Sequence, residues 1–159
     1  MKNVISDLDL VIFDSVDWIR ETCPASGSLD RHAWNMHHAH ADMVKPNLDF
    51  IPVFQQWVDL GLERAFFITS REDINGMREI TEKQIREFLS YVKGADKLEL
   101  YLYMRNACDY RPAPTLKEET LLQKIYPYHY VDLAVDDSES NCEVYRKWNI
   151  PTLYYTKFK

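Results

Sequence analysis

Short apolar segments alternate with longer amphipathic segments along this chain, and this alternation constrains the fold more than any other feature. The apolar segments have the length and composition of buried strands, and the amphipathic segments follow the 3.6-residue period of helices. Strands are predicted over residues 3–6, 64–69, 98–104, 131–135 and 152–156, and helices over 46–61, 74–94, 115–126 and 138–148. This order predicts an α/β fold with three layers, in which helices cover both faces of a central parallel five-stranded sheet.

Length and composition narrow the class of protein. The 159 residues suit one domain, predicted over 1–159, and 46% hydrophobic with 28% charged residues is typical of a globular chain. No apolar run approaches the ~20 residues of a membrane span, so no membrane partner is expected. Three scattered cysteines without disulfide or zinc spacing favour a reducing cytoplasm. A net charge of −6 argues against extended contact with a nucleic-acid backbone but allows local binding of one end.

The residues that follow the predicted strands indicate the chemistry, because ligands of open parallel sheets bind beyond the carboxyl ends of the strands. The polar residues there are Asp7 and Asp9, then Thr69, Ser70 and Arg71, then Arg105, Arg111 and Lys117, and finally Asp136 and Asp137. Carboxylates gathered at one edge repel one another unless a cation is present, and Mg²⁺ prefers oxygen ligands. A lysine, a hydroxyl and arginines are the groups that bind phosphate. The sequence therefore predicts a magnesium site beside a phosphoryl site.

Each of these motifs, taken singly, is more often a turn, a helix cap or a solvated side chain. Thr115 with Glu118, for example, forms a capping-box pattern that predicts the start of a helix at residue 115. The histidine-rich stretch 31–42 lacks a complete set of ligands at fixed spacing, so we interpret it as a loop bordering the site rather than a second metal site. The order of the motifs, each at a successive strand end, favours the functional interpretation.

This order resembles the haloacid dehalogenase superfamily of phosphotransferases, which have a Rossmann-like fold. The family motifs correspond to "DLDLV" at 7–11, Thr69, Lys117 and the acidic pair 136–137. Many members have Gly-Thr after the second aspartate, where this chain has Leu10-Val11. The segment "RNACDYRPAPTLKEE" at 105–119 is similar to the 3′-phosphatase domain of bacteriophage-type polynucleotide kinases. The phosphate-loop motif of the kinase half does not occur in this sequence.

The resemblance implies a Mg²⁺-dependent phosphomonoesterase that forms an aspartyl-phosphate. Asp7 would be the nucleophile and Asp9 the general acid and base. Thr69 and Lys117 would hold the phosphoryl oxygens. The implied ligands of Mg²⁺ are Asp7, Asp9 through its backbone carbonyl, Asp136 and Asp137, and the implied substrate-binding residues are Ser70, Arg71, Arg105 and Arg111.

The short segment between the first strand and the first long helix predicts a minimal cap and an open site. Open sites suit large substrates, so a 3′-phosphorylated nucleic-acid end is the expected substrate and polynucleotide 3′-phosphatase the expected activity. The alternative is a 5′(3′)-nucleotidase or a small-molecule phosphatase, because "DLDLVIFDS" also resembles nucleotidase openings. A non-catalytic binding module would not need the whole set of motifs. A cytoplasmic location is expected, in the host cytoplasm for a phage protein.

Overall fold

A five-stranded parallel sheet forms the centre of the protein. The structure is a computed structural model that describes residues 1–22 and 43–159. The strands lie in the order β5-β4-β1-β6-β7, and every neighbouring pair is parallel. Their bounds are Asn3–Ser6 for β1, Arg64–Glu72 for β4, Glu99–Arg105 for β5, Leu133–Asp136 for β6 and Thr152–Tyr154 for β7. The predicted α/β fold with a parallel five-stranded sheet is confirmed.

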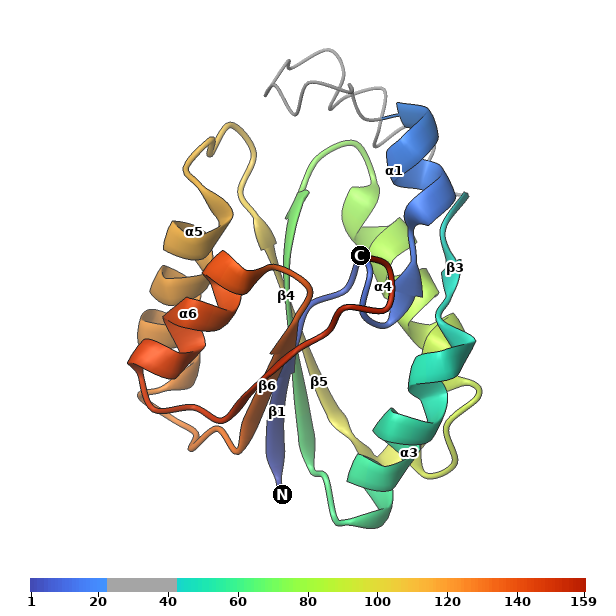
Figure 1. The fold of residues 1–159 in the computed structure, drawn as a ribbon, viewed down its shortest axis with the longest axis vertical. Helices are drawn as coiled ribbons and strands as arrows, with labels where there is room; N and C mark the ends of the chain where they lie inside the picture. The colour runs from blue at the N-terminus through green and yellow to red at the C-terminus, as the bar shows by residue number, and fades with distance from the viewer. Residues whose placement is uncertain (23–42) are drawn as a thin grey trace.

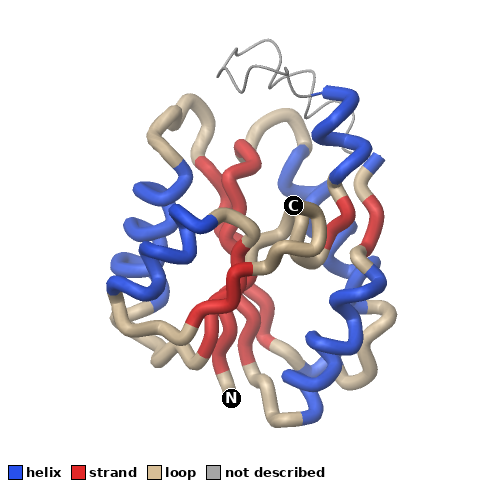
Figure 2. The backbone as a smooth tube through the Cα atoms, viewed as in Figure 1, coloured by secondary structure: helices blue, strands red, loops and turns tan. Residues whose placement is uncertain are grey.

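Helices cover both faces of this sheet, as Figures 1 and 2 show. Helices α5 (Ala113–Thr120) and α6 (Glu139–Lys147) lie on one face, and α3 (Ile51–Asp59) and α4 (Met77–Leu89) lie on the other. Shorter turns are η2 (Leu48–Phe50), η3 (Ala95–Lys97) and the π-helical turn η4 (Leu121–Ile125), which continues α5. Within the described ranges, every helix is too short or too polar to cross a bilayer.

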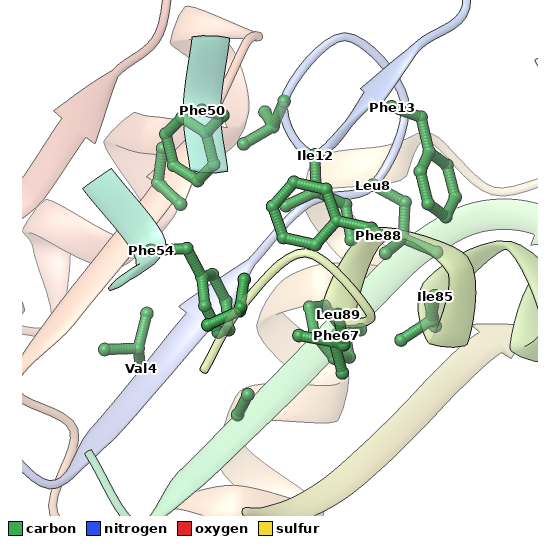
Figure 3. Close-up of a cluster of buried hydrophobic side chains, with 14 of the residues drawn as sticks. Val4, Leu8, Ile12, Phe13, Phe50, Phe54, Phe67, Ile85, Phe88 and Leu89 are labelled. Carbon is green, nitrogen blue, oxygen red and sulfur yellow. The ribbon is translucent and has the colours of Figure 1, made fainter. Parts of the chain in front are cut away.

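Two hydrophobic cores, one on each face of the sheet, hold the layers together. Successive side chains of a strand point to opposite faces, so Val4 of β1 enters the core under α3 and α4, whereas Ile5 enters the core under α5 and α6. In the first core, drawn in Figure 3, Phe54 and Phe88 are fully buried and their rings meet edge to face at 5.6 Å. The sheet is thus fixed from both sides, which makes its strand ends a rigid platform.

A small second sheet lies near the carboxyl edge of the main sheet. Strand β2 (Phe13–Asp14) pairs antiparallel with β3 (Lys45–Pro46), and helix α1 (Val16–Thr22) follows β2. These elements were not predicted, because they are too short to show a hydrophobic period. The histidine-rich stretch 31–42, and with it much of the predicted cap, lies outside the described residues.

Several helix boundaries differ from the predicted ones. The helix predicted from residue 46 begins at Ile51, because Pro46 pairs in β3 and η2 intervenes. The capping box at Thr115 is wrong: α5 begins at Ala113 after Pro112, so Thr115 lies inside its first turn. The helix predicted to reach Gly94 ends at Leu89.

Candidate active site

Three carboxylates meet at the carboxyl edge of the sheet. Asp7 directly follows β1, Asp136 ends β6, and Asp137 is the next residue. One carboxylate oxygen from each lies within 4.8 Å of the other two. These are hard oxygen donors, the kind that Mg²⁺ binds, so the donor set fits this ion. The orientation of Asp136 is fixed by the Asn141 amide and the Ser138 backbone N–H, which both donate to Oδ1 at 3.0 Å.

Lys117 lies between two of these carboxylates and is almost completely buried, at 2% exposure. Its Nζ is 2.6 Å from Asp136 Oδ2 and 3.0 Å from Asp7 Oδ1. Helix α5 carries this lysine back over the sheet, so a residue 110 positions from Asp7 in the sequence contacts it in the fold. An ammonium group at this position can also bind a phosphoryl oxygen beside Asp7.

The electrostatics of this cluster are those of buried, closely spaced charges. Burial raises the pKa of Asp7 well above its ordinary value, and the charges of Asp136, Asp137 and Asp9 raise it further, while Lys117 opposes them. Burial alone would lower the pKa of Lys117, but the carboxylates of Asp136 and Asp7 outweigh it and raise that pKa well above the ordinary value. The three carboxylates of Asp7, Asp136 and Asp137 carry more negative charge than Lys117 can balance, and a divalent cation would supply the missing positive charge.

Asp9 lies outside this cluster, because its side chain is held by Arg71 and Ser15. Arg71 Nε donates to Asp9 Oδ2 at 2.9 Å and Nη2 donates to Oδ1 at 2.7 Å, which makes a bidentate ion pair. Ser15 Oγ donates to Oδ1 at 2.6 Å. The carboxylate is thus fixed in one orientation.

Arg71 itself is fixed on every side and is 2% exposed. Its Nη1 donates to Thr81 Oγ1 at 3.0 Å and to Gln84 Oε1 at 2.6 Å, both on α4. The guanidinium lies over the rings of Phe13 and Trp18, at 5.1 and 4.7 Å. Arg71 therefore lies against Asp9 and outside the lining of the pocket described below. These contacts favour a role in orienting Asp9 over direct contact with substrate.

The other predicted substrate residues lie together around the loop after β5. Arg105 Nε donates to the Ser70 carbonyl at 3.1 Å, and its Nη1 donates to the carbonyls of Asp109 and Arg111 at 2.9 and 2.6 Å. Arg111 pairs with Asp109 and with Glu119 of α5. The side-chain hydrogen bond from Arg111 lowers the pKa of Asp109 to about 2. Arg105 thus organises the loop, and Asp109 orients Arg111.

A pocket of about 320 Å³ opens beside these residues. Its lining includes Thr69, Ser70, Lys117, Arg105 and Arg111. Thr69 is 5% exposed, and its Oγ1 accepts a hydrogen bond from the Arg71 backbone N–H at 3.1 Å. The structure therefore brings together Thr69, Ser70, Lys117 and two of the three predicted arginines. The residues that the sequence did not single out are Ser15, which contacts Asp9, and Thr81 and Gln84 of α4, which contact Arg71.

The turn after Asp9 has an unusual backbone conformation. Leu10 has φ +63°, in the left-handed region that glycine adopts most easily. Its N–H donates to the Phe13 carbonyl at 2.9 Å, and the Phe13 N–H donates to the Leu8 carbonyl at 3.0 Å. The position where many superfamily members have glycine therefore keeps the glycine conformation with a leucine side chain.

Comparisons with known proteins agree with this geometry. The family described as "Polynucleotide kinase PNKP phosphatase domain" matches residues 22–157, a range that begins after Asp7 and Asp9. Two solved structures of Pnkp1/Rnl/Hen1 complexes, one titled as an RNA repair complex, are 25% identical to this chain with TM-scores of 0.64 and 0.63. They cover 96% and 99% of this chain, which spans only 45% and 43% of theirs.

A more distant structure shares the fold alone. A haloacid dehalogenase-like family hydrolase from Streptococcus pneumoniae is 11% identical, with a TM-score of 0.61 over 96% of this chain and 83% of its own. No curated protein matches the sequence. The family match covers most of the chain, and the sheet order and the strand-end carboxylates agree with it. This chain is therefore a haloacid dehalogenase-type phosphatase that belongs to the polynucleotide kinase PNKP phosphatase domain family.

Proposed function

We propose that this protein is a Mg²⁺-dependent polynucleotide 3′-phosphatase that works through an aspartyl-phosphate on Asp7. The observation that carries the proposal is the buried cluster of Asp7, Lys117 and Asp136 at the carboxyl edge of the sheet, in a chain of this phosphatase family. The RNA repair complex named for one structural neighbour favours nucleic-acid ends over metabolites as substrates.

Two displacements at phosphorus make up the reaction. In the first, an oxygen of Asp7 bonds to phosphorus while the bond from phosphorus to the nucleoside 3′-oxygen breaks, and that oxygen takes a proton from Asp9. In the second, water attacks the aspartyl-phosphate and gives a proton to Asp9. The bond between phosphorus and Asp7 then breaks, which releases inorganic phosphate and restores both aspartates.

Asp9 has to exchange partners during this cycle. Both of its oxygens accept hydrogen bonds from Arg71, and Ser15 adds a third. Asp9 can give a proton to the leaving oxygen only if it is protonated at the start of the cycle, and the oxygen that carries this proton has to turn away from the guanidinium. Arg71, which Thr81 and Gln84 hold in place, then keeps the other oxygen oriented. The contact with Arg71 thus keeps Asp9 in place while one of its oxygens changes hydrogen-bond partner.

Phosphate binding and charge balance fall to the rest of the cluster. Lys117 and Thr69 would contact the phosphoryl oxygens as charge shifts between attacking and leaving groups. The side chains of Asp7, Asp136 and Asp137, with the Asp9 carbonyl, would hold Mg²⁺. A bound Mg²⁺ would offset the repulsion between Asp7 and an incoming phosphate.

Phosphate release from a defined panel of substrates tests the proposal. The panel comprises 3′-phosphorylated RNA and DNA oligonucleotides, their 5′-phosphorylated counterparts and mononucleotides, each with Mg²⁺ and with Asp7→Asn. Asp96→Asn, an exposed carboxylate in η3, is the matched control. We expect release from 3′ ends that Asp7→Asn abolishes and Asp96→Asn preserves. Release mainly from mononucleotides would instead establish the nucleotidase alternative.

A further inference from the structure

The pocket beside the active site extends well beyond the residues that hold a phosphoryl group. Besides Thr69, Ser70 and Lys117, its lining includes Tyr103 and Arg105 of β5 and Gln123 and Lys124 of η4. Strand β5 is an edge strand, so this side of the pocket opens to the surface of the molecule. Its volume of about 320 Å³ lies in the range of small-molecule sites, ~300–1,000 Å³. We call this whole pocket the β5 groove.

The charge of the β5 groove is positive, in contrast to the net charge of −6 for the whole chain. Five basic and two acidic side chains line it, namely Arg78, Arg105, Arg111, Lys117 and Lys124 with Asp109 and Glu119. Arg111 and Lys117 are already paired with carboxylates. Among the described residues, Lys124 forms no ion pair and Arg105 donates only to carbonyl oxygens. Arg78 is also paired with a carboxylate, so Lys124 and Arg105 are the lining cations outside an ion pair in the described part of the chain, and the charges of Asp109 and Glu72 act on Arg105 from a greater distance.

An aromatic side chain, Tyr103, lines the β5 groove. Tyr103 is half-buried, and its ring is parallel to that of Tyr101 within 10°, at a centroid distance of 6.5 Å. Tyr101 in turn stacks on buried Phe66 at 4.9 Å. The rings of Tyr101 and Phe66 hold Tyr103 in place, and Tyr103 lines the pocket. Lys124 Nζ lies 6.0 Å over this ring.

The position of Lys124 depends on an irregular helix. Residues 121–125 form the π-helical turn η4, a rare conformation that occurs frequently at functional sites. Leu121 and Ile125 are fully buried in this turn, whereas Gln123 and Lys124 are exposed and line the groove. The turn lies about 10 Å beyond Lys117 along the helix, from a rise of ~1.5 Å per residue.

We propose that the β5 groove binds the terminal nucleotide of a single strand whose 3′-phosphate lies at Asp7. The base packs on the Tyr103 ring at the place where Lys124 Nζ lies 6.0 Å over it in the unliganded protein, and Lys124 turns from the ring to bind the phosphate on the 5′ side of that nucleotide. Arg105 lines the same pocket. This inference rests on the proposed function and adds to it, because it assigns recognition to a strand of nucleic acid rather than to a lone phosphate ester. Aromatic faces and isolated cations are what a single strand requires, because every base can stack and every nucleotide carries a phosphate.

Kinetics with paired substrates test the base contact. Two 3′-phosphorylated hexanucleotides are compared, one with a base on the terminal nucleotide and one abasic there. For the unmodified protein we expect KM to be about ten-fold lower when the base is present, consistent with the strength of base–aromatic stacking. Tyr103→Leu should reduce that ratio to about one, and Tyr103→Phe should keep it. Tyr128→Leu, at a tyrosine that is 73% exposed outside the groove, is the matched control.

Salt dependence tests the phosphate contact at a position where folding is not at risk, because Lys124 is exposed. Lys124→Gln should make the slope of log kcat/KM against log salt less steep by ~0.7, the value for one phosphate contact on a single strand. Lys97→Gln, at an exposed lysine in η3, should leave the slope unchanged. RNA and DNA versions of the substrate show whether the groove distinguishes the two.

The outcomes separate this inference from the function on which it rests. An unchanged base ratio in Tyr103→Leu together with an unchanged slope in Lys124→Gln would overturn the groove and leave the phosphatase standing. Release from p-nitrophenyl phosphate without release from either hexanucleotide would overturn the polynucleotide function, and the groove with it. The expected pair of effects, absent from both control variants, would establish the groove.

Discussion

Asp7 and Asp9, two aspartates one residue apart, should respond in opposite directions to the same substitution. In the metal-free protein, Asp7→Asn removes the attraction of Lys117 at 3.0 Å, which is about 5.5 kcal/mol at an effective dielectric constant of 20. It also removes two repulsions, from Asp136 and Asp137, of at least about 3.5 kcal/mol each at 4.8 Å or less. The repulsions exceed the attraction by about 1.5 kcal/mol, and the relief of burial adds to this difference.

We therefore expect Asp7→Asn to be inactive and more stable. In EDTA its melting temperature should rise by roughly 3 to 6 °C, from the entropy of unfolding typical of a domain of this size. Added Mg²⁺ should then stabilise the unmodified protein more than the variant, because the variant has lost a ligand. The measurement is thermal unfolding by circular dichroism, with and without the metal.

Asp9→Asn provides the opposite case. It leaves the buried guanidinium of Arg71 without its anion, which costs about 3 kcal/mol and lowers the melting temperature by roughly 6 to 12 °C. The same direction of change in both variants would refute the electrostatic reasoning, and a fall for Asp7→Asn in EDTA would refute it on its own.

The pH dependence of the metal-free protein follows from the same cause. Burial raises the pKa of Asp7 above its ordinary value of 3.8, so the folded chain binds this proton more tightly than the unfolded chain. The stabilising contribution is complete below pH 3.8 and is lost as the pH rises through the raised pKa. Denaturant unfolding in EDTA across this window should show a decline that Asp7→Asn lacks.

Other variants test separate parts of the site. Arg71→Lys should lower kcat at least ten-fold and reduce the melting temperature, because an ammonium group cannot hold the bidentate pair; Arg86→Lys, exposed on α4, should change neither, and an active Arg71→Lys would contradict the positioning role. Asp137→Asn should raise the Mg²⁺ concentration needed for half-maximal phosphate release, and an unchanged requirement would remove Asp137 from the ligand set. In a variant that lacks the third cysteine, iodoacetamide at pH 8 should label the exposed Cys108 and spare Cys142, because burial raises the pKa of the Cys142 thiol to about 11. Mass spectrometry of the peptides identifies the labelled cysteine, and labelling of Cys142 instead of Cys108 would contradict this prediction.

The features that sequence alone could predict are those that repeat or follow from topology. Strand β1 has the predicted bounds, because its apolar run is buried on both faces. The meeting of Asp7, Asp136 and Asp137 follows from the rule that parallel strands end at one edge. No local pattern could show the position of Arg71, because its neighbours come from four separate elements and its burial depends on how they pack.

The loop after β5 illustrates the same limit at a smaller scale. Arg105 and Arg111 in this loop were predicted to bind substrate. The amino-acid sequence could not show that Arg105 donates its hydrogen bonds to backbone carbonyl groups of the loop and of Ser70. The predicted start of α5 was wrong for a related reason. Pro112 sets the start of the helix by its fixed φ, which overrides the weaker preference of Thr115 for a cap.

The left-handed leucine after Asp9 bears on how such a turn can change during evolution. A leucine at φ +63° is less stable there than a glycine, by roughly 1 kcal/mol. The turn nevertheless keeps its shape, because the hydrogen bonds among Leu8, Leu10 and Phe13 fix the backbone from outside the residue. The surrounding hydrogen bonds therefore set this conformation without requiring a glycine. A sequence motif that requires glycine after the second aspartate would not match this chain, although its turn has the backbone conformation that glycine adopts most easily.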